Sequence, residues 1–227
     1  MKILFFSDIH ANYEALKQLE SYISEVDLSI CLGDIVGYNC SVNDTIDFLR
    51  RREIVCIQGN HDRYLLEGLK IQKKEINDSV RFGIEFAQKT ITSENREWIS
   101  SLPITYGFIA DNLSVLCCHG NPFDPVNGYV YENNTDFSQF DHFHYDLIAL
   151  GHTHRSMLID RDDMLILNPG SVGQARDYEG MVCAAIIDMK TQKTEFLHLS
   201  YDFNKNLSLS LLNGAGEWIY KHYRTVL

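Results

Sequence analysis

The first 60 residues alternate between short apolar runs and amphipathic stretches, and this alternation constrains the fold more than any other feature of the chain. The apolar runs Lys2–Ser7, Leu28–Leu32 and Ile54–Ile57 are too short for helices and stop at polar or glycine residues, as buried strands do. Between them, Ala11–Ser24 and Asp44–Arg51 carry apolar residues at helical spacing. This strand–helix–strand–helix–strand order predicts parallel βαβ units.

The rest of the chain is predicted to contribute two helices, Ile76–Lys89 and Ser93–Ser101, followed mainly by strands. The predicted strands are Ile104–Ala110, Leu113–Cys118, Leu147–Leu150, Met157–Asp160, Met164–Leu167, Met181–Asp188 and Thr194–Tyr201. Among them, Gly120–Asp141 has no clear periodicity, and a loop this long is usually a functional flap or partly mobile. Helix is expected again from Glu217 onward, after a glycine-containing break. The two halves are expected to pack around two sheets.

The length and composition are those of an ordinary globular protein. The 227 residues are 45% hydrophobic and contain no internal repeat or linker, so we expect a single domain over residues 1–227, with a C-terminal tail at 201–227. The 20 Lys and Arg residues are outnumbered by 31 Asp and Glu, and the net charge of −11 disfavours binding to nucleic acid polymers or anionic membranes. The composition excludes neither a small anionic substrate nor a homo-oligomer.

The sequence predicts neither a membrane segment nor a signal peptide. No apolar run approaches the roughly 18 residues of a membrane helix, and the apolar start of the chain is interrupted at Asp8, too early for a signal-peptide core. The six cysteines form no CxxC pair. Cys31, Cys56, Cys117 and Cys183 lie in apolar runs, which is typical of core residues in a reducing compartment. We therefore expect a cytoplasmic protein.

Five of the predicted strands are followed directly by side chains that bind metals. These side chains belong to the segments Asp8-x-His10, Gly33-Asp34, Gly59-Asn60-His61-Asp62, His119-Gly120 and His152-Thr153-His154. Ligands bind at the carboxyl ends of strands in α/β sheets, so all five segments are expected to meet in one cleft. In extended backbone, residues i and i+2 project to the same side, so Asp8 with His10, and His152 with His154, can each face a common centre.

The candidate ligands comprise two carboxylates, one amide oxygen and four imidazoles, with His61 counted separately. This mixture suits Mn²⁺, Fe²⁺ or Zn²⁺ better than Mg²⁺ or Ca²⁺. Seven ligands are too many for one ion and about right for two ions that share a bridging carboxylate. Two such ions can clamp the attacking and leaving oxygens of an in-line displacement at phosphorus, with a bridging hydroxide as the nucleophile.

Together these segments resemble the signature of the calcineurin-like metallophosphoesterases, and the resemblance runs from residue 1 to about residue 200. Cys31-Leu32-Gly33-Asp34-Ile35-Val36-Gly37-Tyr38 and Asn168-Pro169-Gly170-Ser171-Val172-Gly173-Gln174 are similar to the compact prokaryotic branch that includes phosphodiesterases. The resemblance implies an α/β fold, a four-layer α/β/β/α sandwich of two mixed β-sheets flanked by helices. It also implies a centre of two metal ions at one end of the sandwich.

The resemblance further implies a role for each candidate residue. Asp8, His10, Asp34 and His154 would hold the first metal ion; Asp34 would bridge to the second ion, which Asn60, His119 and His152 would complete. His61 would not be a ligand and would act at the leaving group as a general acid, or stabilise charge in the transition state. Manganese is the expected cofactor, with iron, zinc, nickel and cobalt as alternatives. In the simplest competing view, His61 only orders its loop.

The chain departs from the protein phosphatases of this superfamily just after the Gly33-Asp34 segment. Those enzymes carry an Asp and then a phosphate-binding Arg where this chain has Gly37 and Tyr38. The hypothesis of a protein-phosphatase function is therefore less well supported, and the sequence does not assign the group that orients His61. Because some compact phosphodiesterases have Cys in place of this His, His61 keeps hydrolysis of monoesters open.

Other residues are weaker candidates for a role at the site. Arg63 and Arg176 could grip a phosphate, although each is more often a surface charge. Backbone N–H groups within Asn168–Gly173 could cradle a phosphate, but a tight turn is an equally good interpretation. Tyr129 and Tyr131 could stack on a nucleobase or simply pack the long loop onto the domain. A third metal site could be formed by Asp141, His142, His144 and Asp146, but these are better interpreted as solvated loop residues.

The function expected from these residues is hydrolysis of a phosphate ester by in-line attack of a metal-bridging hydroxide. A small phosphodiester or nucleotide-like compound is the favoured substrate and the expected partner. The alternatives are a phosphomonoesterase or protein phosphatase, a non-catalytic metal-binding scaffold such as the retromer subunit that has this fold, and a nuclease. The scaffold is disfavoured because the ligand set is complete, and the nuclease because the chain shows no basic track.

Overall fold

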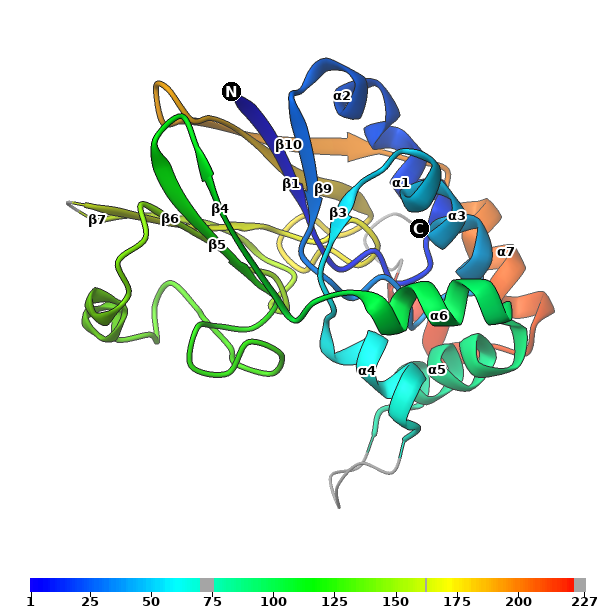
Figure 1. The fold of residues 1–227 in the computed structure, drawn as a ribbon. Helices are drawn as coiled ribbons and strands as arrows, with labels where there is room; N and C mark the ends of the chain where they lie inside the picture. Colours follow the sequence, from blue (N-terminus) through cyan, green and yellow to red (C-terminus); the bar gives the residue numbers. More distant parts are fainter. Residues whose placement is uncertain (70–75, 162, 223–227) are drawn as a thin grey trace.

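The computed structural model describes residues 1–69, 76–161 and 163–222. In this part of the chain, ten strands form two mixed five-stranded sheets, with strand orders β10-β9-β1-β2-β3 and β4-β5-β6-β8-β7 (Figure 1). Helices flank the sheets, so the predicted fold class is confirmed. Among the described residues, no helix combines the length and the apolar composition needed to cross a membrane.

The first sheet contains the predicted βαβ units. Its strands are β1 (Lys2–Phe6), β2 (Leu28–Cys31), β3 (Val55–Cys56), β9 (Met181–Asp188) and β10 (Lys193–Ser200). Strands β1, β2 and β3 are parallel, and β9 joins β1 in antiparallel register with Phe5 opposite Ala185. The single helix predicted between β1 and β2 is divided into α1 (Tyr13–Leu16), a 3₁₀ turn η1 (Lys17–Leu19) and α2 (Glu20–Glu25).

The second sheet is built from strands in the later half of the chain. They are β4 (Thr105–Ala110), β5 (Leu113–Cys118), β6 (Leu147–Ala149), β7 (Ser156–Arg161) and β8 (Met164–Pro169). The central strands β5, β6 and β8 are parallel to one another, whereas the edge strands β4 and β7 pair antiparallel. Each sheet therefore contains three adjacent parallel strands, which end on the same side.

Three apolar clusters hold these layers together. Between the two sheets, Phe5, Ile30 and Leu167 are buried. The outer face of the first sheet packs against helices through residues such as Ile46 and Ile84. The helices on that side include α3 (Val42–Arg51), α4 (Asn60–Glu67), α5 (Asp78–Thr90) and α6 (Ser93–Ser101) (Figure 1).

The outer face of the second sheet is covered by the connection between β5 and β6. Val130 and Phe140 of this connection are buried against Ile148 and Ile166, and its helical part is the 3₁₀ helix η2 (Phe137–His142). The long segment that sequence patterns indicated as a flap thus forms much of the layer over the second sheet.

Two α-helices of the described residues were not predicted. Helix α4 begins at Asn60, directly after a strand and inside the candidate site, and α7 (Phe203–Leu212) follows Asp202, whose side chain accepts a hydrogen bond from the N–H of Asn204. The helix expected from Glu217 is a 3₁₀ helix, η3 (Glu217–His222), and residues 223–227 of the predicted tail lie outside the described residues. Ile76 and Asn77 precede α5, with Asn77 as its N-cap.

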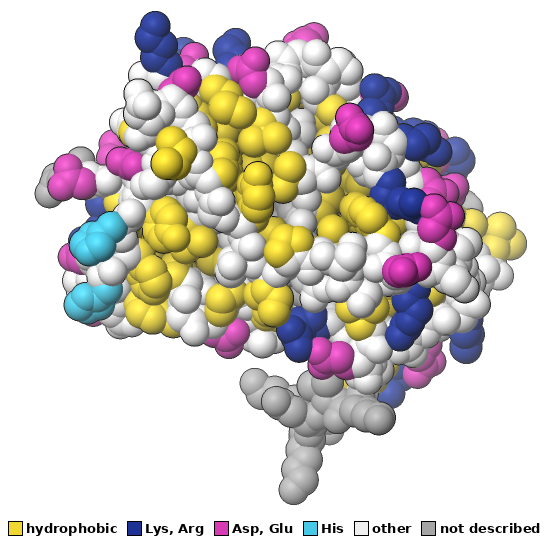
Figure 2. All heavy atoms as spheres, in the orientation of Figure 1, with side chains coloured by type: hydrophobic (Ala, Val, Ile, Leu, Met, Phe, Trp, Pro, Cys, Tyr) yellow, Lys and Arg dark blue, Asp and Glu magenta, His cyan; other side chains and the backbone are white. Residues whose placement is uncertain are grey.

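The drawn face of the molecule carries charges of both signs. On the face drawn in Figure 2, Lys and Arg side chains are interspersed with Asp and Glu over the helical side, and hydrophobic side chains gather over the second sheet. All six cysteines are free and buried, including the four expected in the core, Cys31, Cys56, Cys117 and Cys183.

Candidate metal centre

The candidate ligands meet where strands of both sheets end. Asp8 follows β1, Asp34 follows β2, and Asn60 begins α4 after β3; His119 follows β5, and His152 and His154 follow β6. With His10, all seven side chains are buried, and His152 is the most exposed of them at 8%. The structure therefore brings together the whole predicted set, although its members span residues 8 to 154.

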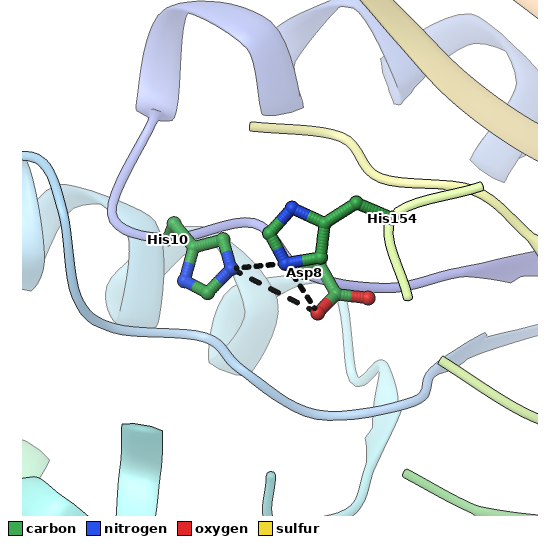
Figure 3. A group of neighbouring side chains, drawn as sticks. All are labelled: Asp8, His10 and His154. Atoms are coloured by element: carbon green, nitrogen blue, oxygen red, sulfur yellow. Dashed lines mark hydrogen bonds and ion pairs between the residues drawn. The ribbon is translucent and has the colours of Figure 1, made fainter. Parts of the chain in front are cut away.

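Asp8, His10 and His154 form the first group of ligand atoms (Figure 3). Nε2 of His154 lies 3.2 Å from Oδ1 of Asp8 and 3.1 Å from Nε2 of His10. Nε2 of His10 lies 3.8 Å from the same carboxylate oxygen. Two imidazole nitrogens and a carboxylate that converge on one point match the donor set that divalent transition metals prefer.

Asp34, His119 and His152 form the second group. Oδ2 of Asp34 lies 3.4 Å from Nε2 of His119, and Oδ1 of Asn60 lies 3.1 Å from the same nitrogen. The same Oδ2 atom is also 3.8 Å from Nε2 of His10, which belongs to the first group. Asp34 therefore lies between the two groups, in the position that a carboxylate shared by two cations would need.

Backbone carbonyls orient three of the imidazoles. Nδ1 of His10 lies 3.2 Å from the carbonyl oxygen of Val36, and Nδ1 of His119 lies 2.8 Å from that of Leu32. Nδ1 of His154 lies 2.8 Å from the carbonyl oxygen of Gln174. An Nδ1–H that donates to a carbonyl leaves the lone pair on Nε2, the atom that faces the centre, as in protein metal sites.

The local backbone differs from the extended conformation assumed in the sequence argument. Asp8, His10, Asp34, His152 and His154 all have positive φ, between 52° and 68°. Residues held in this sparsely populated region are strained by about 1–3 kcal/mol each and cluster at functional sites. Asp8 and His10 belong to one ligand group, and His152 and His154 belong to different groups of the same centre, which is the division implied by the family resemblance. Only the extended conformation assumed for these pairs is wrong.

Hydrogen bonds between neighbouring loops maintain these conformations. The N–H of Asp8 donates to the carbonyl of Gly33, and the N–H of His10 donates to that of Asp34. The N–H of His152 donates to the Asp8 carboxylate over 3.1 Å. The loops of the two sheets thus position each other.

The centre favours positive charge. Burial raises the pKa of Asp8 and of Asp34, but the neighbouring imidazoles outweigh it and hold both well below the usual value, so both carboxylates are ionised. Burial lowers the pKa of His119, yet the Asp34 and Asp8 carboxylates raise it to about 9. Burial, helped by His119, lowers the pKa of His152 to about 4. Two ionised carboxylates in a buried site require compensating positive charge.

Unsatisfied buried atoms point to the same conclusion. Among the described residues, Oδ1 of Asp8 and Nε2 of His152 are buried and make no hydrogen bond. A buried polar atom without a partner costs about 1–3 kcal/mol. Oδ1 of Asp8 lies 3.2 Å from Nε2 of His154 in the first ligand group, and His152 belongs to the second. A divalent cation in each group would supply the missing partners, so the residues present fit such ions.

His61 lies beside the two ligand groups. Its N–H donates to Oδ1 of Asp34 over 2.8 Å, and its Nε2 is 4.0 Å from Oδ2 of the same residue. His61 could also complete a third group of ligand atoms with His10 and Asp34. Burial lowers its pKa, with the Asp34 carboxylate opposing the effect.

The imidazole ring of His61 is packed by an aromatic ring, whereas the Asp34 carboxylate holds only its backbone N–H. The ring of Tyr38 stacks on His61 at 4.9 Å and meets His10 edge-on at 4.6 Å. Within the described residues, Nδ1 of His61 makes no hydrogen bond, and the backbone of Gly37 packs against it. Packing by Gly37 and Tyr38 thus replaces the acidic partner that the protein phosphatases of this fold are expected to use.

Asp62 was quoted within a motif but given no role, and the structure shows that it ties two ligand loops together. Its buried carboxylate accepts hydrogen bonds from the N–H groups of Ile35 (3.0 Å), Val36 (3.2 Å) and Gly59 (2.9 Å). Burial and the nearby Asp34 carboxylate raise the pKa of Asp62 to about 7. Its position three residues after Gly59, at the start of a helix, is the sequence signal that could have identified it.

The weaker candidates for phosphate binding differ in their position relative to the centre. Arg63 pairs with Glu67 on the exposed face of α4, as a surface charge does. The N–H of Arg176 donates to the carbonyl of His154 over 3.0 Å, which places the residue beside the centre. Within the Asn168–Gly173 segment, the N–H groups of Gly170, Val172 and Gly173 are already hydrogen-bonded inside the protein, which favours the tight turn over the cradle.

The disfavoured third metal site gains no support within the described residues. Asp141 pairs with Arg161 at 2.7 Å. Asp146 accepts hydrogen bonds of 2.6 Å from the N–H and the hydroxyl of Ser114. These acidic side chains are not among the groups with metal-ligand spacing in the described part of the chain.

Comparisons with known proteins agree with this geometry. Residues 1–192 match the family model of the calcineurin-like phosphoesterase superfamily domain. An uncharacterized protein of Methanocaldococcus jannaschii is 31% identical over 236 residues, which cover 96% of this chain and 95% of the relative.

Two crystal structures share the fold along nearly the whole chain. A metallophosphoesterase from Sphaerobacter thermophilus is 26% identical with a TM-score of 0.81, covering 100% of this chain and 99% of the other. A hypothetical protein from Pyrococcus horikoshii is 20% identical with a TM-score of 0.83, covering 97% of this chain and 96% of the other.

Proposed function

The chain belongs to the calcineurin-like phosphoesterase superfamily, and on that premise we propose that it hydrolyses a small phosphodiester at a centre of two divalent metal ions. Family membership indicates a metal-dependent phosphoester hydrolase. The observation that carries the finer proposal is the position of Asp34, whose Oδ2 atom lies 3.4 Å from His119 in one ligand group and 3.8 Å from His10 in the other.

The proposed ligand sets follow the two groups. Asp8, His10, Asp34 and His154 would hold the first ion, and Asp34, Asn60, His119 and His152 the second. Mixed nitrogen and oxygen donors suit Mn²⁺, with iron, zinc, nickel and cobalt as alternatives. When bound, two such ions supply Lewis acidity and lower the pKa of water next to phosphorus.

His61 would assist the leaving group. Its Nε2 faces Asp34 from the rim of the centre, 4.0 Å from the carboxylate. A phosphate anion at the centre would favour the protonated imidazole, which could then donate its proton to the departing oxygen. The packing of Gly37 and Tyr38 against the ring would hold it in place for this transfer.

Tyr38 supports a diester over a monoester. Burial raises the pKa of Tyr38 to about 12, so its hydroxyl is neutral at physiological pH. An arginine at this position would complement the two charges of a phosphate monoester. A neutral hydroxyl offers less to a dianion and suits the single charge of a diester.

Comparative turnover tests this function. Metal-stripped protein would be reconstituted with Mn²⁺ and assayed on bis(p-nitrophenyl) phosphate and on p-nitrophenyl phosphate, with Asp34→Asn as the control. We expect faster hydrolysis of the diester, and loss of both activities in Asp34→Asn. Faster hydrolysis of the monoester would contradict the diester assignment, and undiminished turnover by Asp34→Asn would contradict the shared carboxylate.

We further propose that residues 1–227 act as one domain in the cytoplasm on a small phosphorylated substrate. The apolar cluster shared by the two sheets supports a single domain. The six free, buried cysteines support a reducing compartment.

A further inference from the structure

The proposed metal centre is most open on the side of His152, the most exposed of its seven side chains at 8%. Tyr129 stands on this side. Its ring centroid lies 4.1 Å from that of His152, with 34° between the ring planes, and the residue is 54% exposed. A large, exposed aromatic ring therefore lies against the most exposed side chain of the proposed centre.

Tyr129 is one of a pair of parallel rings. Its ring and that of Tyr131 are 5.8 Å apart, with only 5° between their planes. Val130, between them in the chain, is 3% exposed and packs into the cluster beneath the second sheet. The buried valine anchors the backbone, so both tyrosines are directed away from that core.

The segment before Tyr129 is fastened to the centre. The N–H of Gly120, directly after His119, donates to the carbonyl of Pro125 over 2.7 Å. The N–H of Gly128 donates to the carbonyl of Asp124 over 3.0 Å. The loop thus turns back against a proposed metal ligand, and the ring of Tyr129 is positioned before any ligand arrives, which lowers the entropic cost of binding.

The surroundings suit a group that is flat and attached to a phosphate. Tyr64 lies beside His61 at 5.5 Å. Arg176 is close enough to influence both Tyr38 and Tyr129 electrostatically. An aromatic platform next to a phosphate site and an arginine is the arrangement on which proteins stack nucleobases.

We propose that Tyr129 and Tyr131 form a stacking platform for a nucleobase, so that the substrate is a nucleotide ester whose phosphate lies at the metal centre. This inference rests on the proposed phosphodiesterase function and specifies its substrate class. The simpler view is that Tyr129 only packs its loop onto the domain. Phe123 provides the comparison, because it is 53% exposed in the same loop but packs against Phe140 and Phe143.

Binding of two matched ligands tests the platform independently of turnover. Isothermal titration calorimetry on Mn²⁺-loaded protein would compare AMP with ribose 5-phosphate, which has the same sugar and phosphate and no base. Both ligands would be checked for integrity afterwards. Because stacking of one base is worth a factor of about 10–100 in affinity, we expect AMP to bind the wild-type protein that much more tightly.

The variants assign this preference to the tyrosine rings. Tyr129→Ala should bring the affinities for AMP and ribose 5-phosphate within about threefold, whereas Tyr129→Phe and Phe123→Ala should keep the wild-type preference. Tyr131→Ala should weaken the binding of AMP and leave the binding of ribose 5-phosphate unchanged.

Equal affinities for the two ligands in the wild-type protein, no binding of either, or an unchanged preference in Tyr129→Ala would overturn the platform. The outcome is separate from that of the proposed function. A protein that hydrolyses the aryl diester but ignores the base refutes only the platform, and one that prefers AMP but hydrolyses nothing refutes only the catalytic proposal.

Discussion

Gly37 is the position where one added methyl group should separate catalysis from metal binding. It adopts a φ of +106°, and a Cβ there would lie under 3.0 Å from Nδ1 of His61. The atoms nearest to this added Cβ all belong to the His61 ring. Gly37→Ala therefore acts first on the His61 ring, which is not one of the seven proposed ligands.

The magnitude follows from the contact and the backbone. To restore an ordinary van der Waals separation, the His61 ring must retreat by roughly 1 Å, and a misplacement of that size at an active site costs about 100-fold in rate. The unfavourable φ adds a loss of about 1–3 kcal/mol in the free energy of unfolding. For a chain of this length, each kcal/mol lowers Tm by about 2–4 °C. We expect kcat to fall about 100-fold, with metal content unchanged.

Gly214→Ala is the matched control for backbone strain. Gly214 has a φ of +91°, and a Cβ there would meet nothing within 4 Å. Steady-state kinetics on the diester, metal analysis and thermal unfolding would be measured for both variants. Gly214→Ala should lower Tm by an amount comparable to that of Gly37→Ala and should leave kcat at the wild-type value. If Gly37→Ala retained wild-type kcat, or lost metal in proportion to activity, the position and role assigned to His61 would be refuted.

Two further predictions concern His61 and Asp146. His61→Ala should lower kcat by a factor of about 100 to 10,000, the range for a lost general acid, while metal analysis finds the wild-type content; parallel loss of metal would identify His61 as a ligand. The hydrogen bonds from Ser114 lower the pKa of Asp146 below its ordinary value of 3.8. Their contribution to the free energy of unfolding is therefore present above pH 3.8 and is lost as the pH falls through the folded-state pKa. Asp146→Asn should therefore lower the free energy of unfolding by about 0.5–1 kcal/mol at pH 7, and urea titrations should show the deficit shrinking below pH 4; a deficit that grows in acid would contradict this account.

The parts of the fold that the sequence predicts are those with a local signal. Short apolar runs identified most strands, because a buried parallel strand is apolar along its whole length. Helix α7 escaped detection because its Leu-Ser-Leu-Ser alternation from Leu207 to Ser210 has the period of a strand, whereas packing on α1 and η3 makes it a helix. Helix α4 begins inside the candidate site, and its buried residues Asn60, His61 and Asp62 are polar, so it shows no apolar stripe in its first turn.

The candidate ligands could be predicted because each follows a strand in a short motif. Their conformations could not, since the positive φ values of Asp8 and His154 depend on hydrogen bonds and packing between loops far apart in the chain. The stacking of Tyr38 on His61 and the ties made by Asp62 are also long-range contacts that no spacing reveals. The sequence thus predicts which residues meet at the candidate site, whereas the contacts that support them are visible only in the three-dimensional structure.

The most direct test of the account is the number of metal ions bound per chain. Protein stripped of metal, reloaded with Mn²⁺ and freed of excess ion would be analysed by inductively coupled plasma mass spectrometry, for the wild type and for Asp34→Asn. The account predicts two ions per wild-type chain and a clear loss in Asp34→Asn, because Asp34 lies between both ligand groups. One ion or none in the wild type, or two retained by Asp34→Asn, would contradict a centre built on a shared Asp34.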